Sequence, residues 1–173
     1  MSRAAFVRVV ALLVLSVAGL APAVQAATSV TCVGNSTITF SPGLTLFTRA
    51  VAYNVTDLHN CTSTDPTITS ASSSRGTVLP LSCLNLASVF NSANIYTITW
   101  SNGQTSTADG TFTLTSVGGT IIVAAEGTVT SGLFTGATAV LTYTWPAPDP
   151  LACLSPQGVT QLTGVTTLQI TSL

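Results

Sequence analysis

The side chains of this chain that could carry hydrolytic chemistry are one histidine, five carboxylates and many serines. His59 follows Asp57 by two residues, and residues two apart share one face of a strand, so an acid and a base could stand together as in a Ser-His-Asp triad. The Gly-x-Ser-x-Gly sequence that presents a nucleophilic serine does not occur. Because serine is so frequent, any histidine has one nearby. We therefore predict that His59 is a surface-loop or capping residue and that the chain has no catalytic site.

Carboxylate pairs and metal-ligand clusters are poorly represented. The acids are Asp57, Asp65, Asp109, Glu126 and Asp149. All but Glu126 stand beside turn sequences, where an Asp side chain commonly caps its own backbone, and Glu126 is expected to face outward from a strand. The chain has neither a Cys-x-x-Cys pair nor a calcium-loop sequence. We predict no metal site and no cofactor.

The four cysteines are Cys32, Cys61, Cys83 and Cys153. An even number of cysteines in an exported chain predicts structural disulfides, here two. Three pairings are compatible with the sequence. Among them we favour Cys32 with Cys61 and Cys83 with Cys153.

The N-terminus has the order of residues that is typical of a secretory signal peptide. Two arginines precede an apolar run over 9–20, and small residues end at Ala26. This run is too short to cross about 30 Å of hydrocarbon as a helix. We expect cleavage after Ala26, which makes residues 1–26 a signal peptide and leaves residues 27–173 as a single secreted domain with no membrane span.

The charge of the expected mature chain limits its partners. Arg49 and Arg75 remain beside five carboxylates, so two minus five gives a net charge of −3, and there is no lysine. Two cations cannot neutralise a run of phosphates, so nucleic acid and anionic membrane surfaces are poor candidates as partners. With 46% hydrophobic residues and a small net charge, the chain should fold.

Turn residues divide the first half of the expected domain into strands and loops. We predict strands over 29–40 and 44–55, and a long loop or a ragged sheet edge over the polar stretch 57–75. A further strand over 77–84 contains Pro80, which donates no ladder hydrogen bond and therefore predicts an edge position or a bulge.

The clearest strand signal is the alternation of Tyr96, Ile98 and Trp100 with threonines. These side chains are expected to face the core, and Asn102-Gly103 follows them as a preferred hairpin turn. We favour core packing over a sugar-binding platform for the tryptophans and tyrosines. A strand around Phe112 and another over 120–130 should complete a meander.

Three further segments follow. Leu133 and Phe134 should fold back onto the sheet, a strand should cover 138–145, and the proline-rich stretch 146–156 should be irregular and held by Cys153. A last strand is expected over 164–171. Eight or nine short strands without helical periodicity predict an all-β fold, an antiparallel β-sandwich of immunoglobulin-like type, with a β-barrel as the alternative.

Several stretches resemble a group of small exported proteins of actinomycetes: Phe40-Ser-Pro-Gly-Leu44, Ser82-Cys83, Ile98-Thr-Trp100, Gly127 to Ala139, and Pro156-Gln-Gly-Val159. The resemblance covers the whole expected mature chain, and the stretch from Gly127 is its most specific part. It implies export and a bacterial source, and it assigns no functional residues.

These observations favour a secreted, non-catalytic domain that presents a surface to a cell-envelope component or to another extracellular protein. The alternative is a secreted enzyme inhibitor of the protease-inhibitor type, with a disulfide-braced bait loop at 155–158 or 57–75. A hydrolase is the least favoured interpretation, since the chain has few ionisable side chains.

Overall fold

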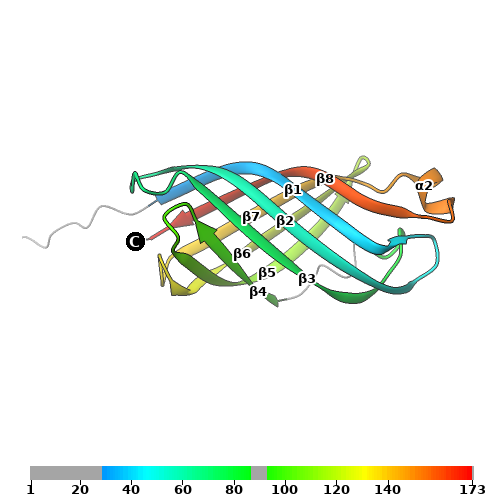
Figure 1. Ribbon diagram of the computed structural model, residues 1–173, viewed down its shortest axis with the longest axis horizontal. Coiled ribbons are helices and arrows are strands. Elements are labelled where there is room, and N and C mark those ends of the chain that lie inside the picture. The colour runs from blue at the N-terminus through cyan, green and yellow to red at the C-terminus, as the bar shows by residue number, and fades with distance from the viewer. Residues whose placement is uncertain (1–28, 87–92, 173) are drawn as a thin grey trace, which may run out of the picture.

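The computed structural model describes residues 29–86 and 93–172, which form a closed barrel of eight antiparallel strands (Figure 1). The strands are β1 (Ser29–Leu44), β2 (Arg49–Ser63), β3 (Ser70–Leu81), β4 (Ala93–Trp100), β5 (Thr105–Val117), β6 (Thr120–Gly132), β7 (Thr138–Pro146) and β8 (Val159–Thr171), and helix α2 (Pro150–Leu154) lies between β7 and β8. The expected signal peptide, residues 1–26, lies outside the described residues.

Alternation of side chains along each strand builds the barrel interior. In β7, Ala139, Leu141, Tyr143 and Trp145 are all buried, whereas the intervening residues point outward. Apolar residues from all eight strands fill the interior in this way, and threonines cover much of the outside. The high threonine content therefore supplies a wettable outer face that still favours strands.

The strand predicted most firmly from the sequence is confirmed. Tyr96, Ile98 and Trp100 in β4 are each 2% exposed. Gly103, with φ of 80°, turns the chain into β5, which pairs with β4 antiparallel. Phe134 folds back onto the barrel and meets the Trp100 ring edge to face at 5.4 Å.

The all-β class and the barrel alternative are confirmed, but the strands do not form a two-layer immunoglobulin-like sandwich. β1 pairs with β8 from Ser29 opposite Thr171 to Leu44 opposite Val159, which closes the sheet on itself. Glycines let neighbouring strands approach closely: a Cβ added at Gly127 would stand 1.8 Å from the Asp109 carbonyl oxygen. Long, bent strands of this kind favour closure over two flat layers.

The prediction of a long loop over 57–75 is wrong. β2 continues to Ser63 and β3 begins at Ser70, so most of this polar stretch forms paired strands. Its polarity suggested a loop, but inward-facing Asp57 and His59 find polar partners inside the barrel. Likewise, β8 begins at Val159, five residues before the expected start.

The seam between β3 and β4 is short. These strands pair only over Ala71–Ser73 and Ile98–Trp100, so the rest of β3 pairs with β2 alone among the described strands. Pro80 lies in this second part of β3, opposite Ala50. β3 as a whole is an inner strand of the barrel, but among the described residues Pro80 has a partner strand on the β2 side alone.

Both favoured disulfides are present. Cys32 and Cys61 are register partners on β1 and β2, with Cα atoms 4.0 Å apart, and Cys83 joins the segment after β3 to Cys153 in α2. The proline-rich segment expected to be irregular contains this one-turn helix, which Asp149 caps by accepting a hydrogen bond from the Leu151 N–H. Two disulfides are typical of proteins from oxidising, extracellular environments.

Candidate functional site

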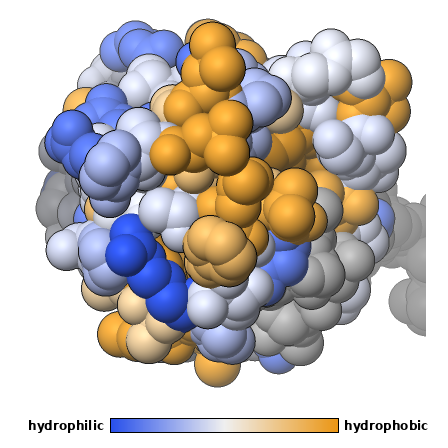
Figure 2. Space-filling model, turned by 90° about the vertical axis from the view of Figure 1, so that its right-hand side faces the viewer, coloured by the Kyte–Doolittle hydropathy of each residue, from blue (hydrophilic) through white to orange (hydrophobic). Residues whose placement is uncertain are grey.

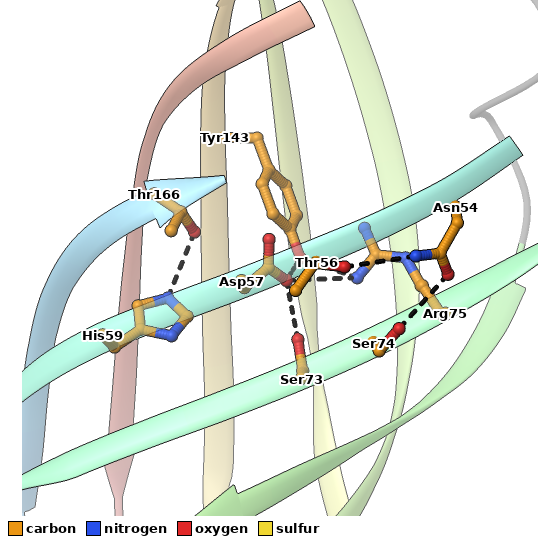
Figure 3. Close-up of polar contacts among 9 residues, drawn as sticks. All are labelled: Asn54, Thr56, Asp57, His59, Ser73, Ser74, Arg75, Tyr143 and Thr166. Atoms are coloured by element: carbon orange, nitrogen blue, oxygen red, sulfur yellow. Dashed lines mark hydrogen bonds and ion pairs between the residues drawn. The ribbon is translucent and has the colours of Figure 1, made fainter. Parts of the chain in front are cut away.

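Polar side chains from three strands meet inside the barrel (Figure 3). The hydroxyls of Ser73 and Tyr143 donate hydrogen bonds to Oδ2 of Asp57, at 2.6 Å and 2.8 Å. Nη1 of Arg75 donates to the Tyr143 hydroxyl at 2.6 Å and lies 3.9 Å from the same carboxylate oxygen. The tyrosine therefore links the two charged groups, and we name these four residues the interior cluster.

Aromatic rings enclose the arginine of the interior cluster. The Arg75 guanidinium carbon lies 5.0 Å from the centre of the Phe112 ring and 4.9 Å from that of Tyr143, a cation–π geometry. Burial alone would lower the pKa of Arg75, but Tyr143 and Asp57 outweigh it and raise that pKa. Burial raises the pKa of Tyr143 well above its usual value and that of Tyr96 to about 12.

His59 is not the surface-loop or capping residue that the sequence predicted. It lies on β2, is 5% exposed, and its Nε2 is 3.3 Å from the Thr166 hydroxyl on β8. Burial lowers the pKa of His59, which nearby Asp57 and the Ala71 carbonyl offset only in part. The physical reason for the error is strand alternation, which turns His59 inward with Asp57.

The described hydrogen bonds do not assemble a catalytic triad. His59 contacts Thr166, and Ser73 contacts Asp57 directly, so no serine is linked through His59 to the acid. Asp57 is fully buried and the Arg75 side chain is 10% exposed. A molecule outside the barrel could reach this carboxylate only if the wall opened.

A second candidate site, an exposed apolar surface, lies at the end of the barrel that carries α2 (Figure 1). Four large apolar side chains stand out there: Phe47, Leu84, Leu151 and Leu154, which are 82%, 77%, 76% and 66% exposed. They come from three segments that the Cys83–Cys153 disulfide and a hydrogen bond from the Cys83 N–H to the Thr45 carbonyl hold together. Figure 2 looks onto this end and shows hydrophobic side chains gathered across it. We name these four residues the apolar end.

A pocket of about 360 Å³ opens between the β1–β2 turn and α2. Arg49 is the one cation in its lining. The apolar lining residues are Leu46, Phe47, Cys153, Leu154 and Pro156. Nη2 of Arg49 donates to the Gly43 carbonyl at 2.5 Å, which holds the side chain against the turn. The pocket therefore combines a largely apolar wall with a positive charge.

Of the remaining acids, Asp65, Asp149 and Glu126 lie as the sequence predicted, whereas Asp109 lies within β5 and not at a turn. Asp65 accepts from the N–H and hydroxyl of Thr67, which lowers the pKa of its carboxyl, and Asp149 caps α2. Glu126 is exposed on β6, and Asp109 is exposed on β5. In residues 29–86 and 93–172, no group of three metal-ligating side chains comes together and no helix is long and apolar enough to cross a membrane.

Sequence reasoning missed the apolar end. Phe47 falls within the strand predicted over 44–55, but it lies in the turn between β1 and β2. Leu151 and Leu154 fall within the proline-rich segment 146–156, for which the sequence predicts only irregular structure. Turn position alone would not have found them, since Leu133 and Phe134 also lie in a turn and pack against the core.

Comparisons with known proteins identify no relative. No family model matches the chain, no curated protein matches it, and no solved structure matches it.

Proposed function

We propose that this chain is a secreted binding domain that works without catalysis, through its apolar end. The observation that carries the proposal is the group of four exposed, large apolar side chains, two of which, Phe47 and Leu154, line one pocket. Contiguous exposed apolar surface on a folded domain is typical of interaction sites. A cell-envelope component or an extracellular protein is the partner class we infer, in line with the likeness to exported actinomycete proteins.

The disulfide at this end supports a binding role. The Cys83–Cys153 bond ties together two of the three segments that carry the apolar side chains, and the Cys83 N–H bonds to the third. A surface that is already held in place loses less conformational entropy when a partner binds. The brace therefore favours affinity as well as stability.

An enzyme inhibitor is the second candidate function. The loop 155–158 begins two residues after Cys153, its central residues are exposed, and Ser155 and Pro156 line the same pocket. However, the Gly158 N–H bonds back to the Ser155 carbonyl and hydroxyl, which makes this segment a tight turn. The other expected bait loop, 57–75, is mostly strand, so a protease would have little extended loop to bind.

The test is binding of the exported protein to isolated cell envelopes of the producing organism. We expect the double variant Phe47→Ser, Leu154→Ser to bind at least about tenfold more weakly, because each large apolar side chain contributes about 1.5–3 kcal/mol when buried. Leu58→Ser is the matched control, since Leu58 is 65% exposed but lies on the outer face of β2. Equal binding by both variants would refute the role of the apolar end.

A further inference from the structure

The pocket at the apolar end has the chemistry of a site for an anionic amphiphile. Resting on the binding role proposed above, we propose that it takes the acyl chain of a fatty acid, with the carboxylate on Arg49. Pockets that bind small molecules start at about 300 Å³, and this one holds about 360 Å³. It is therefore large enough for one chain and too small for a folded partner.

The charge argument starts from Arg49. Among the described residues, the ion pair that forms is the one between Arg75 and Asp57, so Arg49 has no carboxylate partner. Its Nη2 is held by the Gly43 carbonyl, and its Nε is buried without a hydrogen-bond partner. Asp149 belongs to the same end, but Oδ1 of its carboxylate accepts from the Leu151 N–H. An uncompensated guanidinium favours an anion, since charge-assisted hydrogen bonds are the stronger ones.

The polar groups of the pocket favour an acyl chain over a peptide. The Thr45 hydroxyl donates to the Phe47 carbonyl at 3.2 Å, and the Ser155 hydroxyl donates to the Ala152 carbonyl at 2.7 Å. Both hydroxyl protons are thus used within the chain. A peptide would bring backbone amides and carbonyls that need partners on burial, whereas an acyl chain brings none.

The experiment is calorimetric titration of the exported protein with decanoate below its micelle concentration. Two soluble probes separate the two halves of the proposal: decyltrimethylammonium keeps the chain and reverses the charge, and acetate keeps the carboxylate without the chain. We expect measurable binding of decanoate, much weaker binding of the cation and none of acetate. Across a series of shorter carboxylates, affinity should rise about fourfold per methylene until the pocket is filled.

Substitutions locate the binding. Arg49→Gln should weaken decanoate binding by about tenfold or more and leave the cation unaffected, while Arg49→Lys should restore part of the loss. Leu154→Ser should weaken both ligands, and the control Leu58→Ser should weaken neither. Circular dichroism checks that each variant keeps its fold, and the comparison of decanoate with the cation on the unsubstituted protein needs no variant.

Three outcomes would overturn the assignment. The first is equal binding of decanoate and decyltrimethylammonium, and the second is unchanged decanoate binding by a folded Arg49→Gln variant. The third is tighter binding of acetyl-trileucine, which offers a peptide carboxylate, than of decanoate. The last would assign the pocket to a protein C-terminus instead. If decanoate fails while envelope binding still depends on Phe47 and Leu154, the acyl-chain assignment is wrong and the binding role of the apolar end stands. If envelope binding does not depend on them, the proposed function is wrong.

Discussion

Nη1 of Arg75 and Oδ2 of Asp57 lie 3.9 Å apart inside the barrel, and the Tyr143 hydroxyl bonds to both. Asp57 is on β2, Arg75 on β3 and Tyr143 on β7, so this contact crosses the interior between opposite parts of the wall. The expected mature chain has two arginines, and they lie in different environments. Arg75 is enclosed and contacts Asp57 and Tyr143 inside the barrel, whereas Arg49 lines a pocket at the surface.

Breaking the interior cluster should strongly destabilise the fold. Asp57→Asn leaves the Arg75 guanidinium buried without its countercharge, and we expect a loss of about 3–5 kcal/mol in the free energy of unfolding. Tyr143→Phe removes the bridging hydroxyl and should cost about 1–3 kcal/mol. Urea unfolding measures both, with exposed Glu126→Gln as a control expected within about 0.5 kcal/mol. A cost below about 1 kcal/mol for Asp57→Asn would contradict this account.

His59 should make stability depend on pH. Burial lowers the folded-state pKa of His59 below its unfolded value of about 6.5, so the unfolded chain binds more protons as pH falls. This contribution to stability is therefore fully present above about pH 6.5 and is lost as pH falls below that value toward the folded pKa. The urea concentration at the midpoint of unfolding should therefore decrease as the pH is lowered from about 7 to about 5.

The control for this prediction is His59→Gln, which keeps a group able to bond to Thr166 but does not titrate. Its urea midpoint should vary much less over the same pH range. The Asp65 carboxyl, whose pKa is lowered from about 3.8, adds its own loss of stability only at more acidic pH. A slope in the variant as steep as in the parent protein would assign the effect to other groups.

Local alternation was readable in the sequence, but the partners across the barrel were not. Tyr96, Ile98 and Trp100 are buried as predicted because period-two patterning depends on neighbouring residues alone. Closure of the sheet depends on β1 meeting β8, a contact between chain ends that no local pattern encodes. The interior positions of Asp57 and His59 were missed for the same reason, since their partners Tyr143 and Thr166 come from distant strands.

The disulfides should differ in their effect on function. We expect intact-mass analysis to show a loss of about 4 Da relative to the reduced chain, because both pairs are formed. Removing the Cys32–Cys61 pair, with a sequence separation of 29, should cost about 3.6 kcal/mol, and removing Cys83–Cys153, with a separation of 70, about 4.4 kcal/mol.

Measurements of envelope binding distinguish the effects of removing the two disulfides. Cys83→Ser with Cys153→Ser should weaken binding because this bond braces the apolar end, whereas the double serine variant of Cys32 and Cys61 should bind normally while folded. Measurements at low temperature keep both variants folded, and circular dichroism verifies it. Equal loss of binding in both would show that the brace acts on global stability alone.

Trp100 anchors β4 where the seam with β3 is short. Its indole N–H donates to the Ser106 hydroxyl at 2.8 Å, which in turn donates to the Leu133 carbonyl, and its ring packs against Phe134. Trp100→Ala removes this packing and leaves a cavity, so we expect a loss of about 3–5 kcal/mol in the free energy of unfolding. Thr99→Ala, one residue away but on the exposed outer face, should cost less than about 0.5 kcal/mol. Urea unfolding of the two variants in parallel checks the difference, and comparable costs would mean that β4 does not hold the register with Trp100 inside and Thr99 outside.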